Sequence, residues 1–345
     1  MTSKLENFSV NYFLTRALFL GIGFSVIIGL SRQDSILAFI VGTILGIFFI
    51  FLINKIQKFK GDKTLGDVLK EMKGFGIFLR IVLLLFFIVF LMEGLTFIQL
   101  FASSFFLIRT PIWFISLPLL LLLLRISKNG IITTFRVSAC LLPISVVLTL
   151  LSLFALCGYA DISNVSPLFV TEPLSFLKSV FYYTSLSVSP SILMLVTNKS
   201  NSTYSYLFGS FTLIAKMFLI IAVVGPLLAS IYRFPEYIIL KEIKLLDFIE
   251  KIENVVALSW IFDVFIYLSM SSVFIKELLP KKKKGLVHGF LVFLIYIISV
   301  MFVGKYYTNE LIIYYILPIF TAVVFIITIP ILFIHTYKKR LITTK

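Results

Sequence analysis

Long, predominantly apolar runs of 18 or more residues recur along the whole chain, and this feature limits the possible folds more than any other. About 20 apolar residues in succession are enough to cross the hydrocarbon core of a bilayer as a helix. The composition agrees, because 60% of the 345 residues are hydrophobic, whereas a soluble domain has about 45–50% apolar residues. The sequence therefore predicts an all-α polytopic membrane protein.

Ten transmembrane helices are expected, and together they would form a single membrane domain over residues 1–345. The expected spans are 10–30, 35–54, 77–107, 111–125, 130–158, 174–197, 203–231, 253–275, 286–304 and 311–337. The sequence contains no phosphate-binding GxxxxGK[ST] loop, no HExxH and no GxSxG. We therefore expect no cofactor, no metal site and no enzymatic activity.

The distribution of basic residues predicts the orientation of the chain, because cytoplasmic loops are enriched in Lys and Arg. With the N-terminus in the cytoplasm, the inner segments hold 20 basic residues and the outer segments hold 8. Both termini are therefore expected to be cytoplasmic. The runs "KKKK" (281–284) and "YKKR" (337–340) would then face anionic headgroups, so we expect membrane lipids, and not nucleic acid, as partners.

Two connections between spans are amphipathic and are expected to lie along the membrane surface. Residues 61–76 precede the third span on the inner side, and residues 236–252 precede the eighth span on the outer side. Each stretch therefore precedes the third span of a five-span half, and the two lie on opposite faces. This organisation predicts an inverted 5+5 repeat, with halves at about 10–158 and 174–337.

Weak helix formers interrupt two of the expected spans. The first contains "GIGFSVIIGL" (21–30), in which each glycine costs about 1 kcal/mol relative to alanine. Span 6, its counterpart in an inverted repeat, contains "YTSLSVSPS" (183–191). A matching pair of interrupted spans points to a midplane substrate site, so helices 1 and 6 are expected to be discontinuous. Alternatively, the glycines only allow close helix packing. The ligand-binding residues expected at the breaks are Gly21, Gly23, Ser185, Ser187 and Ser189.

Four charged residues lie well inside the expected spans, namely Glu93, Arg136, Lys216 and Asp263. Each costs about 2.5–3.5 kcal/mol at a helix centre, so each should face protein or water and have a partner. One interpretation is a polar cavity that binds an amino acid zwitterion or moves a proton, with Glu93 on the ligand and the other three in ion coupling. The other is a pair of structural salt bridges. Arg16 and Arg80 are expected to reach the inner interface and to have no special role.

Several stretches resemble the spore germination permeases, which are the B subunits of nutrient germinant receptors. The most specific is "FPEYIILKEIKLLDFIEKIENVVALSWIFDVFIYLS" (234–269), which is similar to the outer helix and eighth span of that family. "FLMEGLTFIQLF" (90–101) and "GIITTFRVSACLLPI" (130–144) are similar to its third and fifth spans and include Glu93 and Arg136. The resemblance covers nearly the whole chain, although "MEG" replaces the usual basic–acidic–aromatic triplet around the acid of the third span.

The resemblance implies the fold of the amino acid–polyamine–organocation transporters, with ten helices in two inverted halves. It also implies a receptor in the spore inner membrane that binds a small-molecule nutrient and assembles with a larger membrane A subunit and a C-subunit lipoprotein.

Three functions remain compatible with the sequence, because the fold does not separate them. The first is a germinant receptor subunit that binds a small polar nutrient, expected to be an amino acid, at a transporter-like site. The second is a proton-coupled secondary amino acid transporter. The third is a scaffold subunit with a vestigial pocket.

A cysteine near the C-terminus tests the predicted orientation. In a chain whose native Cys140 and Cys157 are replaced by alanine, Thr343→Cys should react with a membrane-impermeant thiol reagent only after the membrane is permeabilised. Lys241→Cys, in the stretch expected outside, should react in intact cells and serves as the control. Labelling of Thr343→Cys in intact cells would contradict the orientation.

Overall fold

The computed structural model describes residues 3–19, 22–197, 202–242, 252–280, 284–303 and 316–343. Over these ranges the chain is helical and has no strand, and nine helical runs are long and apolar enough to cross a membrane. This confirms the predicted all-α polytopic membrane protein. One of the nine runs, Gly23–Lys60, contains both the end of the first expected span and the whole of the second. The count of ten and the inverted repeat therefore stay predictions.

The helices occupy the positions expected from the apolar runs. In chain order they are α1 (Lys4–Arg16), α2 (Ile22–Ser31), α3 (Ser35–Lys60), α4 (Leu65–Glu71), α5 (Lys73–Phe105), α6 (Ile112–Asn129), α7 (Ile131–Cys157), α8 (Pro173–Val188), α9 (Ser202–Ile231), α10 (Pro235–Glu242), α11 (Ile252–Leu278), α12 (Lys284–Val303), α14 (Leu317–Val323) and α15 (Ile329–Thr343). Short 3-10 helices follow α1 (η1, Ala17–Phe19) and α8 (η4, Ser189–Val196), and a π-helix (η6, Val324–Thr328) joins α14 to α15.

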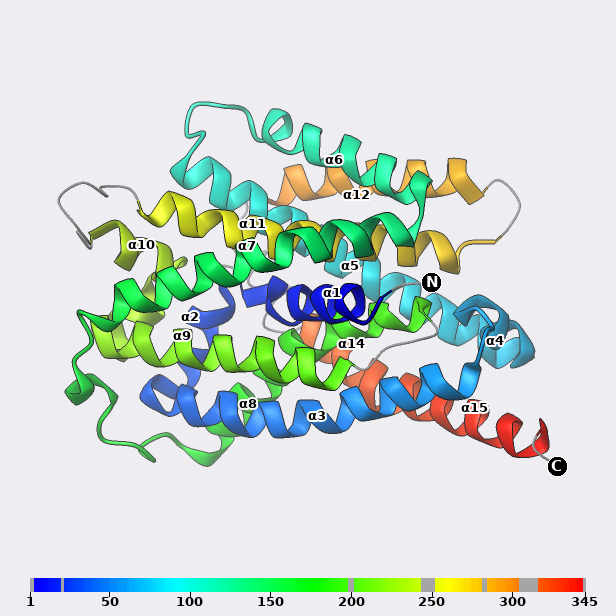
Figure 1. Cartoon of the computed structure of the whole chain (residues 1–345), viewed down its shortest axis with the longest axis horizontal. Helices are drawn as coiled ribbons and strands as arrows, with labels where there is room; N and C mark the ends of the chain where they lie inside the picture. The colour runs from blue at the N-terminus through cyan, green and yellow to red at the C-terminus, as the bar shows by residue number, and fades with distance from the viewer. Residues whose placement is uncertain are drawn as a thin grey trace.

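The long helices run roughly along the long axis of the molecule, and the short helices α4 and α10, one from each amphipathic stretch, lie at its opposite ends (Figure 1). The helix α4, from the first stretch, lies at the same end as the C-terminus, whereas α10, from the second, lies at the other end. This agrees with the expectation that the two stretches are on opposite faces of the membrane. The remainder of the second stretch, residues 243–251, lies outside the described residues.

The first apolar run is broken, as predicted. The helix α1 ends at Arg16, the chain passes through the 3-10 turn η1, and α2 begins at Ile22. Gly23 allows α2 to approach η1 closely, because a Cβ at this position would lie 2.8 Å from the carbonyl oxygen of Leu18. The sixth expected span changes at Ser189 from an α-helix to the narrower 3-10 geometry of η4. Gly21 lies outside the described residues.

The helix α1 is buried from Ser9 to its end, although this part contains several polar residues, so these residues need internal partners. Asn11 donates to the backbone oxygen of Ser202 at 2.9 Å and to the hydroxyl of Ser205 at 3.1 Å. It also accepts from the hydroxyl of Ser191 at 2.9 Å, which joins α1 to η4. These bonds attach the broken first span to the 3-10 part of the sixth span and to the start of α9.

Glycines also serve helix packing in this fold. Gly42 and Gly46 form a GxxxG pair on α3, and a Cβ at either position would collide with a tyrosine ring, Tyr183 of α8 or Tyr206 of α9. Close helix packing through glycine, which the sequence left open as the role of the glycines in the first span, is therefore clearest on α3.

Candidate functional site

A small cavity lies at the break between α1 and α2. Its volume is about 10 Å³, room for about one water molecule. The lining side chains come from α1, η1, α2, α9 and α11, and they are Arg16, Phe19, Phe24, Leu213, Lys216, Trp260 and Asp263. The protein is therefore closed around a site that combines aromatic rings with charges of both signs.

Arg16 and Asp263 form one buried ion pair at this cavity, with 3.1 Å between Nη2 and Oδ2. Arg16 also donates to the Ser259 hydroxyl at 3.1 Å and to the Tyr12 hydroxyl. The expectation that Arg16 reaches the interface is wrong, because only 3% of the surface of Arg16 is exposed. Its position in the last turn of α1, which packs against α7, α9 and α11, directs the guanidinium into the bundle instead.

Lys216 and Glu236 form a second buried ion pair, with 2.7 Å between Nζ and Oε1. The indole N–H of Trp260 donates to Glu236 at 3.2 Å, and the Ser152 hydroxyl donates to it as well. These bonds hold α10 against α7, α9 and α11. Sequence reasoning missed Glu236, because it is one of several acids in the amphipathic stretch and nothing in the sequence distinguishes it as the buried one.

The two pairs give the site the chemistry to hold a zwitterion. Before a ligand enters, each cation neutralises a carboxylate, which keeps the buried charges paired. A ligand carboxylate could replace Asp263 as the partner of Arg16. A ligand ammonium group could replace Arg16 as the partner of Asp263. The rings of Phe19 and Phe24, with centroids 5.6 Å apart, line the same cavity and would exclude water.

The serines predicted to bind ligand lie outside the lining of this cavity. The hydroxyl of Ser185 is buried and has no hydrogen-bond partner among the described residues. The hydroxyl of Ser187 lies 3.2 Å from that of Tyr206, and the hydroxyl of Ser189 lies 3.5 Å from that of Thr321. Their role in ligand binding stays a prediction.

The structure brings Lys216 and Asp263 to one cavity, but not Glu93 or Arg136. Glu93 lies in α5, is fully buried, and neither carboxyl oxygen has a hydrogen-bond partner among the described residues. Arg136 is exposed on α7, and no acid of the described part of the chain forms a salt bridge with it. The expectation that each charge has a partner therefore fails for these two. Arg136 is only six residues into α7, so its long side chain can extend towards the helix end.

The comparisons with known proteins agree with this architecture. The family model described as spore germination protein matches residues 8–307. The chain belongs to this spore germination family. It is 26% identical over 239 residues to YfkT of Bacillus subtilis (strain 168), whose name assigns it to spore germination. That match covers 67% of this chain and 66% of the relative, slightly less than two thirds of the relative's length.

Among solved structures, the chain resembles a Na⁺-coupled sialic acid symporter in a substrate-bound, outward-open state. The TM-score is 0.59 and the identity is 14%, over 92% of this chain and 77% of the symporter, so the likeness concerns the fold. The spore germination family member described here is thus an integral membrane protein with a transporter-like fold. Family and fold point to a permease or receptor-type protein and not to an enzyme.

Unequal effects of single and double substitutions should reveal the second ion pair. Glu236→Gln leaves the Lys216 ammonium buried without a charged partner, which should destabilise the protein by about 3–5 kcal/mol. The double variant Lys216→Met with Glu236→Leu removes both charges and should unfold at a higher temperature than the single variant. Thermal unfolding in detergent measures the order, and a double variant less stable than Glu236→Gln would refute the pairing.

Proposed function

We propose that this chain is the permease-like B subunit of a nutrient germinant receptor, and that it binds an amino acid at the cavity beside the break in the first span. The cavity itself supports the proposal most directly, because it places two cations and a carboxylate beside a broken helix. Among small nutrients, an amino acid has the matching pair of charges.

Binding would act on the Arg16–Asp263 pair. This pair joins the end of α1 to α11, and it keeps the cavity too small for anything larger than water. An amino acid that takes up both charges must separate the two side chains, and α1 can move relative to α2 because the helix is interrupted between them. The movement of α1 would be the signal that triggers germination.

The cellular setting belongs to the proposal as well. The receptor would lie in the spore inner membrane with both termini in the cytoplasm, and it would assemble with the A subunit and the C-subunit lipoprotein. Family membership supports this setting, and so does the position of α4 and the C-terminus at one end of the molecule (Figure 1).

Germination assays on spores with altered cavities test the proposal. Asp263→Asn and Phe24→Leu should each raise the amino acid concentration needed for half-maximal germination. For Asp263→Asn we expect about 10- to 100-fold, because a hydrogen bond to a charged group contributes about 1.5–3 kcal/mol. The panel should contain the twenty common amino acids, and protein abundance and assembly should be measured in parallel.

Arg109→Gln is the matched control, since this exposed residue lies on the link between α5 and α6, away from the cavity. It should leave the dose–response curve unchanged. If Asp263→Asn and Phe24→Leu were present at normal levels and also left the curve unchanged, the proposed site would be rejected.

Glu93 favours a second candidate function, a proton-coupled amino acid transporter. A buried carboxyl group with no partner is tolerated far better when neutral, so it can hold a proton. If the chain is such a transporter, the purified protein should accumulate amino acids in proteoliposomes when a pH gradient is applied, and Glu93→Gln should abolish the accumulation. A receptor subunit should show no net uptake, while Glu93→Gln still shifts the germination response.

A further inference from the structure

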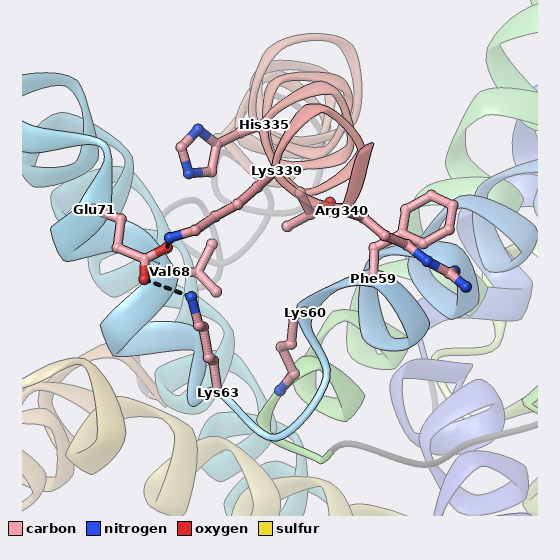
Figure 2. Close-up of a pocket in the computed structure, with 9 residues that line it drawn as sticks. Phe59, Lys60, Lys63, Val68, Glu71, His335, Lys339 and Arg340 are labelled. Atoms are coloured by element: carbon pink, nitrogen blue, oxygen red, sulfur yellow. Dashed lines mark hydrogen bonds and ion pairs between the residues drawn. The ribbon is translucent and has the colours of Figure 1, made fainter. Parts of the chain in front are cut away.

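A second cavity lies at the end of the molecule that carries the C-terminus, about 180 Å³ in volume and far larger than the one beside the broken span. Three segments surround it, namely the end of α3 with the turn after it, the short helix α4, and α15 (Figure 2). Its lining residues, here called the basic pocket, are Phe59, Lys60, Lys63, Val68, Glu71, His335, Thr336, Lys339 and Arg340.

Positive charge in the basic pocket exceeds negative charge by a wide margin. Four of its side chains are Lys or Arg, whereas Glu71 is its single acid. Glu71 already accepts from Lys63 at 2.8 Å and pairs with Lys339 at 2.5 Å, and these bonds, from Lys339 and then Lys63, lower the pKa of its carboxyl group. The lining thus carries one carboxylate and four cations, of which Lys63 and Lys339 contact Glu71 and the buried Lys60 donates to the backbone oxygen of Leu195 at 2.5 Å. A concave surface with such a surplus of positive charge attracts anions.

The remaining lining residues suit an anion that carries an organic group. Nε2 of His335 is buried and has no hydrogen-bond partner among the described residues, and its ring lies beside Lys339 in Figure 2. Phe59 and Val68 supply an apolar wall, and the guanidinium of Arg340 lies 5.2 Å from the Phe59 ring. Polar donors thus stand next to hydrocarbon, an arrangement that fits a phosphate attached to a small organic group.

We infer that the basic pocket is a binding site for a phosphate group, which Lys63 and Lys339 hold from opposite walls of the cavity. Lys and Arg at the end of a membrane helix commonly bind phosphate headgroups. Lys339 and Arg340 belong to the basic run at residues 337–340. A phosphate bound in the pocket would therefore be the partner of these two residues of the run. Either an anionic phospholipid or a soluble phosphate ester could supply the group, and bound phosphate would join the turn between α3 and α4 to α15.

Binding can be measured on the purified full-length chain in phosphatidylcholine nanodiscs. The rise in unfolding temperature with ligand concentration reports affinity, because a ligand that binds only the folded state stabilises it. In one arm phosphatidylglycerol is added to the bilayer, and in the other glycerol phosphate is added to the solution. A shift in the first arm alone assigns the phosphate to lipid, and a shift in the second arm alone assigns it to a soluble ester.

Three substitutions distinguish the pocket from general surface charge. Lys63→Gln and Lys339→Gln should each weaken binding about fivefold, whereas Glu71→Gln should strengthen it by removing the competing carboxylate. Lys58→Gln is the matched control, since Lys58 is exposed on α3 and does not line the pocket, and it should leave binding unchanged.

Each variant's unfolding temperature without ligand shows whether it folds, and Lys63→Arg should retain binding. Two results would overturn the inference. One is the absence of a shift with both ligands, and the other is a shift that Lys58→Gln reduces as much as Lys63→Gln does.

Discussion

A cation buried at the centre of a membrane protein is costly without a carboxylate beside it, and this constraint determines how the two ion pairs at the centre of the molecule are built. Arg16 of α1 pairs with Asp263 of α11 at 3.1 Å, and Lys216 of α9 pairs with Glu236 of α10 at 2.7 Å. The first pair attaches the broken span to the bundle, and the second attaches the short helix α10. Together they connect elements from both halves of the chain at one place.

The break in the first span and the ion pairs depend on each other. A helix that ends inside a membrane leaves backbone carbonyl groups without intrahelical partners, and a cation near that end is favourable. Arg16 occupies the last turn of α1, and the 3-10 turn η1 follows it directly. Gly23 then lets α2 begin close to the carbonyl group of Leu18. The local backbone and the buried charges therefore define a single site.

The fold could be predicted from the apolar runs because helix length and hydropathy are properties of contiguous sequence. The break in the first span was visible for the same reason, through its glycines. The ion pairs were not, since Lys216 could be found as a charge within a span but its partner Glu236 lies on a different helix. Arg16 was misjudged because its distance from the membrane edge says nothing about what α1 packs against. Arg136 shows the opposite case, a charge within an expected span that faces outward.

An amino acid bound at the cavity should replace the internal partners of Arg16 and Asp263. Electron cryo-microscopy of the purified chain in nanodiscs, with and without the amino acid to which the spores respond, tests it most directly. Ligand density is expected between the two side chains, together with a separation of Nη2 and Oδ2 well beyond the 3.1 Å of the closed pair. Ligand density elsewhere in the molecule, with the Arg16–Asp263 pair still closed, would contradict it.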